Sequence, residues 1–125
     1  LFLYGVHPDL FTYSYQVWDS EATAISRAII ECALSEGVGL EINGYGLQKL
    51  VVPTADGLTH SYPHARFWAL AGEYPGLRVV SSSDAHTPGD VAYGIEKTGV
   101  LARSNGIQRS GYRLSDRGIE LYQAQ

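Results

Sequence analysis

Apolar residues fall into short continuous runs that alternate with longer stretches of helical spacing. The run at residues 1–6 is apolar on both faces, as buried parallel strands are. The run at 38–43 is apolar apart from Glu41 and its end, and the run at 77–83 passes from apolar, β-branched residues into serines, so both are also predicted to be short strands. After the first run, apolar residues recur every three or four positions, at Ala22, Ile25, Ile29, Cys32 and Ala33. This spacing predicts a helix that begins at an Asp19 or Ser20 cap and ends at Gly37.

Two further helices and a long connection are expected downstream. Residues 44–62 contain several turn-forming Gly, Pro and Asp residues and predict a long loop. Pro63 suits the first turn of a helix with Phe67, Leu70 and Ala71 on its apolar side, ending at residues 73–76. Another helical stretch is expected from Thr87 or Pro88 to about residue 105, weakened by two glycines.

The last part of the chain gives weaker signals. Residues 107–114 fit either a last strand or an irregular link. Ser115 and Asp116 provide a helix cap, which predicts a terminal helix with Ile119 and Leu121 facing inward. The order strand, helix, strand, helix, strand, helix predicts one α/β domain over residues 1–125, with βαβ units in a parallel sheet or barrel.

Composition narrows the function classes. The net charge of −4, with Lys49 and Lys97 as the only lysines, argues against binding to a nucleic-acid backbone. No apolar run approaches the ~20 residues of a membrane span, and no signal peptide is visible. Cys32 is the single cysteine, so no internal disulfide forms and a cytoplasmic setting is expected. An apolar strand at the first residue, without Met, suggests a piece of a longer polypeptide.

The ends of the three predicted strands share one kind of chemistry. His7 and Asp9 follow the first strand, Glu41 lies near the end of the second, and Asp84 and His86 follow the third. Parallel α/β sheets bind ligands at the carboxyl ends of their strands, so these side chains are expected on one rim. Imidazole with carboxylate suits Zn, Mn or Fe, whereas calcium prefers oxygen alone. Structural readings remain open: Asp84 as a helix cap, and His86 and Glu41 as exposed rim residues.

Other chemistries find less support. The sequence has no glycine-rich nucleotide loop and no nucleophile elbow of the Gly-x-Ser-x-Gly type. Ser83 with Asp84 and His86 is a poor triad, because triad partners are rarely neighbours in sequence. Cys32 lies on the apolar helix face and is expected to be a buried structural thiol.

Four segments together resemble the later motifs of the PHP superfamily, most closely its histidinol-phosphatase branch. They are GVHPDLF at 5–11, LEINGYGL at 40–47, YPHARFW at 62–68 and SDAHTP at 83–88. They stand in the family's order and spacing, and the match as a whole extends over most of residues 4–95. The resemblance implies the C-terminal part of a distorted (β/α)7 barrel that hydrolyses phosphate monoesters such as histidinol phosphate, with two or three divalent metals at its rim.

The resemblance also assigns roles to residues. His7, Asp84 and His86 correspond to metal ligands and catalytic groups that would hold the ions for a metal-activated hydroxide. Glu41 and Asn43 match a family Glu-x-Asn pair, and with Asp9 would orient ligands from behind. Asn43 is also a candidate substrate contact. Arg66 lies within a family-like segment and Lys49 lies two residues after one. Both are candidates for the substrate phosphate, although each also fits a solvated surface charge. For His60 and His64, loop or helix-start roles compete with substrate contact.

The family's opening His-x-His motif has no counterpart here, since no His-x-His occurs in the sequence. The chain therefore resembles the second half of the barrel, and the isolated chain is expected to hold an incomplete site. The missing half, or a second copy of the chain pairing with open strand edges, would be a partner. Two other functions stay open: a PHP phosphoesterase acting on nucleotides or nucleic-acid ends, and a truncated module without catalysis.

Overall fold

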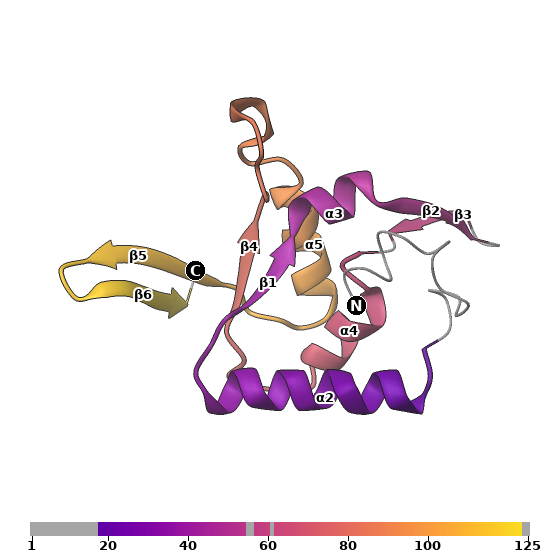
Figure 1. The fold of residues 1–125 in the computed structure, drawn as a ribbon, viewed down its shortest axis with the longest axis horizontal. Coiled ribbons are helices and arrows are strands. Elements are labelled where there is room, and N and C mark those ends of the chain that lie inside the picture. The colour runs from indigo at the N-terminus through magenta and orange to yellow at the C-terminus, as the bar shows by residue number, and fades with distance from the viewer. Residues whose placement is uncertain (1–17, 55–56, 61, 124–125) are drawn as a thin grey trace.

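The computed structural model describes residues 18–54, 57–60 and 62–123 (Figure 1). The predicted strand at residues 1–6 lies outside them. The helices are α2 Ser20–Ser35, α3 Gly44–Lys49, α4 Ala65–Ala71 and α5 Ile95–Ser104, with a 3₁₀ turn at Pro88–Asp90. The strands are β1 Leu40–Asn43, β2 Val51–Thr54, β3 Gly57–His60, β4 Val79–Ser82, β5 Ser110–Ser115 and β6 Gly118–Gln123.

The centre of the fold is a parallel pair of strands. β1 and β4 pair in register from Leu40↔Val79 to Asn43↔Ser82. The chain between them passes through α3, the β2–β3 hairpin and α4, so β1 and β4 are joined by a crossover connection. This confirms a mixed α/β fold with a parallel sheet. The described strands form three two-stranded sheets, and the (β/α)7 barrel stays a prediction.

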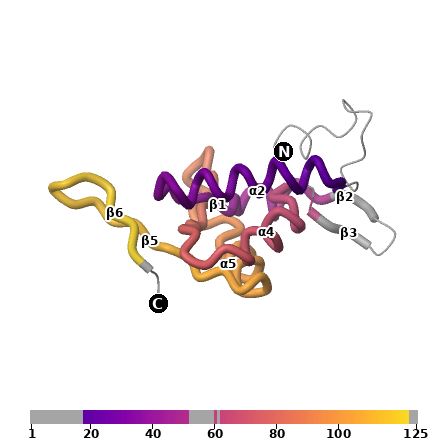
Figure 2. The backbone as a smooth tube through the Cα atoms, turned by 90° about the horizontal axis from the view of Figure 1, so that it is seen from below, coloured from indigo at the N-terminus to yellow at the C-terminus, as the bar shows by residue number. Residues whose placement is uncertain are grey.

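One hydrophobic core joins the central pair to the surrounding helices. Ile42 of β1 and Val79 of β4 are fully buried, and Trp68 of α4 is 3% exposed. Residues of α2, α3, α4 and α5 complete the core: Ile30, Ala33, Leu47, Leu70, Ala71 and Ala102. Figure 2 shows α2 on one side of the molecule, with α4 and α5 toward the other. This core holds β1 and β4 in place, and the candidate site residues lie at the carboxyl ends of these two strands.

Helix α2 begins where predicted but buries a different face. The Asp19 side chain accepts a hydrogen bond from the Ala22 amide at 2.7 Å, which confirms the cap. The buried residues are Ser26, Ile30 and Ala33, while Ile25 and Ile29 are 52% and 40% exposed. The reason is that the apolar residues of α2 span more than one face of the helix. The contact with α4 buries only part of this wide apolar surface. The expectation that Cys32 is buried is therefore wrong, and its thiol is exposed.

The predicted long loop at residues 44–62 is wrong, because it holds α3 and the β2–β3 hairpin. The Asn43 side chain caps α3 by accepting from the Gly46 amide at 2.7 Å. β2 and β3 pair antiparallel from Val51↔His60 to Thr54↔Gly57. The Asp56-Gly57 dipeptide is the signal in the sequence that favours a hairpin here over a loop.

Three helix predictions in the second half need correction. Helix α4 begins at Ala65, with His64 rather than Pro63 at its start, because the His64 ring accepts from the Arg66 amide at 3.2 Å. The stretch after Thr87 is a 3₁₀ turn followed by α5, since Gly94 adopts φ 71° and interrupts any continuous helix.

The predicted terminal helix is wrong as well. Residues 110–123 form the β5–β6 hairpin instead. Apolar side chains there follow a period of two, at Tyr112 and Leu114 and again at Ile119 and Leu121. Ile119, which we expected to face inward, is 71% exposed.

Candidate metal and phosphate site

The carboxyl ends of β1 and β4 bring four of the predicted residues together. Glu41 and Asn43 lie two positions apart on β1 and therefore share a face of the strand. Asn43 is paired in register with Ser82, and Asp84 and His86 follow two and four residues later. Glu41, Asn43, Asp84 and His86 thus follow or end two strands that meet at the same end of the central pair, which we call the rim.

The amide of Asn43 connects the two carboxylates. Its Nδ2 donates to Asp84 Oδ2 at 2.9 Å and more weakly to Glu41 Oε1 at 3.5 Å. Its Oδ1 accepts from the Gly46 amide, so the side chain is held at both ends. Asn43 is 7% exposed, whereas Asp84 and Glu41 are exposed. A buried amide therefore orients two solvent-facing carboxylates toward one another.

Asp84 and His86 form a compact turn after β4. Asp84 has φ 52°, a left-handed conformation that is uncommon for residues other than glycine. Its amide donates to Ser82 Oγ at 3.0 Å, and its carbonyl oxygen lies 2.7 Å from His86 Nδ1. A carbonyl only accepts, so Nδ1 must carry the proton. In the neutral ring, Nε2 then keeps its lone pair, which is the arrangement of metal-binding histidines.

An aromatic row leads from His86 to a cation. The ring of Tyr45, on α3, lies 6.0 Å from the His86 ring and 6.3 Å from that of Tyr93. Lys49 Nζ sits 5.3 Å from the centre of the Tyr93 ring. Gly94 and Gly44 make this row possible, because a Cβ on Gly94 would overlap the Gly44 carbonyl. The close backbone approach draws Tyr93 toward α3.

Tyr62 lies close enough to Glu41 to line the same cavity. It lines a cavity of about 250 Å³ together with Glu41, His64, Phe67 and Trp68. Burial raises the pKa of the Tyr62 phenol, and the negative charges of Glu41 and Asp84 raise it further. The phenol therefore stays protonated beside the two carboxylates at neutral pH.

Sequence reasoning missed three tyrosines near the rim: Tyr45, Tyr62 and Tyr93. Two of them carried a usable signal, because they stand inside the family-like segments at 40–47 and 62–68. Tyr93 lies outside the quoted segments. Both of its neighbours, Ala92 with φ 68° and Gly94 with φ 71°, are left-handed, but only the glycine is a signal that the sequence offers.

The other predicted residues are less closely associated with the rim. Lys49 reaches the rim through Tyr93, but the Arg66 guanidinium contacts the Trp18 carbonyl at 3.5 Å and none of the four rim residues. His64 caps α4. His7 and Asp9 lie outside the described residues.

His60, on β3, is half-buried, and its Nε2 has no hydrogen-bond partner within the described part of the chain. Burial lowers the pKa of His60, with smaller contributions from His64 and Lys97. Nothing in these contacts connects His60 to the rim.

Within the described ranges, no group of three or more His, Cys, Asp or Glu side chains is gathered closely enough to hold a metal ion. Asp84 and His86 are thus two of the three predicted ligands, and the third, His7, is outside these ranges. None of the described helices has the length and apolarity of a membrane span.

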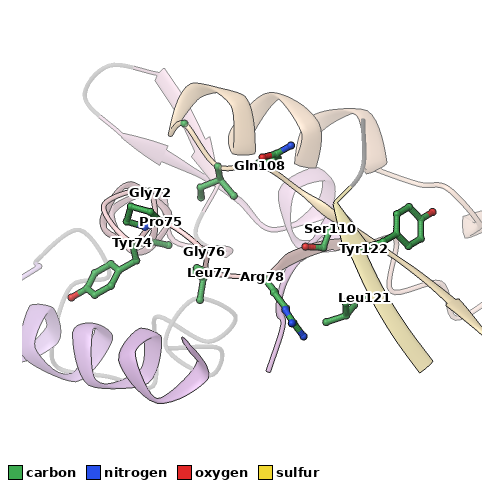
Figure 3. A pocket seen from close by; sticks show the side chains of 13 residues that line it. Gly72, Tyr74, Pro75, Gly76, Leu77, Arg78, Gln108, Ser110, Leu121 and Tyr122 are labelled. Atoms are coloured by element: carbon green, nitrogen blue, oxygen red, sulfur yellow. The ribbon is translucent and has the colours of Figure 1, made fainter. Parts of the chain in front are cut away.

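A larger cavity, of about 460 Å³, lies at the opposite end of β4 (Figure 3). It is lined by the turn before β4, including Leu77 and Arg78, and by Ser110, Leu121 and Tyr122 of the β5–β6 hairpin. Because Arg78 directly precedes β4, this cavity is separate from the rim that carries Asp84.

Comparison with protein-family models, curated proteins and solved structures finds no match to this chain.

Proposed function

We propose that this chain contributes the closing part of a metal-dependent phosphoesterase site of the PHP type. The expected substrate is a small phosphate monoester such as histidinol phosphate. The observation that carries the proposal is the juxtaposition of Glu41, Asn43, Asp84 and His86 at the carboxyl ends of two parallel strands. The proposal draws on the resemblance of four sequence segments to that superfamily.

The geometry of Asp84 and His86 fits a divalent ion. The Asp84 carbonyl fixes the proton of His86 on Nδ1, which leaves Nε2 to bind Zn, Mn or Fe. Asp84 is exposed and has a carboxylate oxygen, Oδ1, that Asn43 does not occupy. A bound divalent ion would supply Lewis-acid polarisation of the phosphoryl group and a water of lowered pKa. In the proposal, Asp84 would also accept a proton from that water.

Asn43 and Glu41 would act behind the ligands. Asn43 holds Asp84 in one rotamer through the 2.9 Å hydrogen bond, and its own position is fixed by the cap of α3. This is the role that hydrogen-bonded residues behind metal ligands commonly play. Glu41 adds a second negative charge on the same face of β1, which favours a cation at the rim.

Lys49 is the better-placed partner for the substrate phosphate. It is exposed, its ammonium group lies over Tyr93, and the Tyr93–Tyr45–His86 row joins it to the rim. Arg66 is the weaker candidate for the substrate phosphate, because its guanidinium contacts the Trp18 carbonyl and none of the four rim residues. The tyrosine row offers flat apolar surface for the remainder of a small ester.

The proposal is tested by metal content and by phosphate release. The 125-residue chain, and a longer polypeptide that contains it, would be purified without chelator, and Zn, Mn and Fe measured by mass spectrometry. Phosphate release would then be compared for histidinol phosphate and a panel of nucleotides. We expect at least one bound metal per complete domain, a loss of activity of ~100-fold or more in Asp84→Asn, and a similar loss in His86→Ala.

Asp116→Asn is the matched control, because it makes the same change at an exposed position between β5 and β6. It should leave metal content and activity unchanged. A polypeptide with only trace metal, whose phosphate release is the same in His86→Ala as in the unmodified protein, would rule out the proposal. A preference for nucleotides would support the alternative substrate class instead.

A further inference from the structure

The β5–β6 hairpin is strongly two-faced. Register pairs Tyr112 with Leu121 and Leu114 with Ile119, and paired residues project from the same face of a sheet. Tyr112, Leu114 and Ile119 are 63%, 81% and 71% exposed. Three large apolar side chains therefore stand together on one face of the hairpin, in contact with solvent.

The opposite face is mostly polar and carries one aromatic side chain, Tyr122, which lies over Gly111. Arg113 and Glu120 form an ion pair at 3.0 Å, and Ser115 Oγ donates to Glu120 at 2.9 Å. A two-stranded sheet with one charged and one apolar face has the pattern of a sheet that covers a partner with its apolar side. The charged face needs no partner, so the apolar face is the one to explain.

The body of the described chain does not cover the apolar face. Figures 1 and 2 show the hairpin extending away from the helices in both views. It is attached at its base, where Leu121 packs near Gly39 and β5 contacts β4. Isolated two-stranded hairpins are at best marginally stable in water and gain stability when a hydrophobic face is packed. The apolar face of the outer half of this hairpin would therefore gain stability from packing against another molecule.

We propose that the apolar face of the β5–β6 hairpin binds the same face of a second copy of this chain. The two hairpins would stack face to face about a two-fold axis, as in a small sandwich with a spacing of ~10 Å. The face carries no charged side chain, so two copies meet without like-charge repulsion despite the net charge of −4. Because the hairpin projects clear of the body, two copies can approach without collision of their helices.

The area available sets the expected strength. Side chains of this size at these exposures contribute roughly 100–150 Å² each, or roughly 600–900 Å² for the three side chains of both copies. Specific interfaces usually bury at least ~1,000 Å² in total, a figure that neighbouring hairpin atoms would bring within reach. The dimer should therefore be weak, with a dissociation constant in the micromolar range.

Sedimentation velocity of the 125-residue chain at about 1 to 200 µM tests the proposal. All variants would carry Cys32→Ser, because the exposed thiol could otherwise link copies. We expect a concentration-dependent dimer that Ile119→Lys weakens by ~10-fold or more. Val91→Lys is the matched control, since Val91 is 70% exposed and lies outside the hairpin, and it should dimerise normally. Circular dichroism would check that each variant is folded.

Cross-linking gives an independent readout. Leu114→Cys should form a disulfide-linked dimer under mild oxidation much faster than Val91→Cys. A chain that is monomeric at the highest concentration would overturn the proposal. So would equal weakening by the two lysine variants, or equal cross-linking of the two cysteine variants.

Discussion

Replacement of Asn43 is the sharpest test of the rim geometry, because this side chain joins a helix cap to the two carboxylates. In Asn43→Ala, the loss of the cap on α3 costs about 1 kcal/mol. Loss of the 2.9 Å hydrogen bond to Asp84 costs about 1 kcal/mol more, taken at the low end because that carboxylate is exposed. The free energy of unfolding should fall by about 2 kcal/mol, a factor of ~30 in the folding equilibrium.

Asn43→Asp separates the two contributions. Its carboxylate can still cap α3, but it replaces the donor 2.9 Å from Asp84 with a like charge. The repulsion, together with the burial of a new charge at a position that is 7% exposed, costs more than the about 1 kcal/mol that the retained cap preserves at neutral pH. Asn43→Asp should therefore be less stable than Asn43→Ala at pH 7. Near pH 4 carboxyl groups begin to take up protons, the repulsion fades and the cap remains, so the order of the two variants should reverse.

Urea unfolding followed by tryptophan fluorescence is the measurement, since Trp68 is buried in the core. The unmodified chain and both variants would be compared at pH 7 and at about pH 4. The reasoning is refuted if the two variants keep the same order at both pH values, or if Asn43→Ala loses less than about 0.5 kcal/mol at pH 7.

Three further predictions concern backbone contact and titration. Gly94→Ala should lower the free energy of unfolding in urea by several kcal/mol, because Gly94 adopts φ 71° and a Cβ there would meet Gly44. Gly106→Ala is the control: Gly106 has a similar φ of 67° but open space around it, so this change should cost only about 1–2 kcal/mol. Equal losses would show that the backbone contact is unimportant. Burial lowers the pKa of His60, so the unfolded chain binds the proton more readily and the free energy of unfolding should fall as pH drops below about 6.5. His60→Gln should make the free energy of unfolding depend less on pH in this range. An unchanged pH dependence in urea unfolding of the variant would contradict the prediction. Because the pKa of Tyr62 is raised, its phenol should ionise above pH 10. In an absorbance titration, Tyr62→Phe should therefore lack a phenolate signal that the unmodified chain develops above pH 10. Loss of a signal that develops at or below pH 10 would contradict this prediction.

The sequence was sufficient for the parallel strands and for most of the rim. Glu41, Asp84 and His86 were predicted because short apolar runs end near these residues and the carboxyl ends of parallel strands share an edge, whereas Asn43 was named only through the family resemblance. What the pattern did not contain was the hydrogen bonding among them. The contact of Asn43 with Asp84 spans 41 residues, and only the register of β1 against β4 brings it about.

The failures at helices and hairpins have a different cause. The terminal segment carries both a helix cap, at Ser115 and Asp116, and strand-like alternation around Tyr112 and Ile119. Local signals conflict there, and pairing across the turn decided in favour of strands. In α2, the apolar stripe was wide enough to allow several buried faces, and contact with α4 selected the one that contains Ile30. The hydrophobic pattern of one helix does not show which neighbouring element that helix packs against.

The position of the rim depends on small residues as much as on the predicted ligands. Gly44 follows Asn43 directly, and its close approach to Gly94 ties the start of α3 to the segment that precedes α5. The same stretch of α3 carries Tyr45 toward His86, so a shift of this backbone contact would move the aromatic row and the capped amide together. A larger residue at either glycine should therefore disturb Asp84 through Asn43, even though neither glycine touches the carboxylate. The chemistry of the rim is held in place by a backbone contact that no metal-ligand pattern in the sequence would reveal.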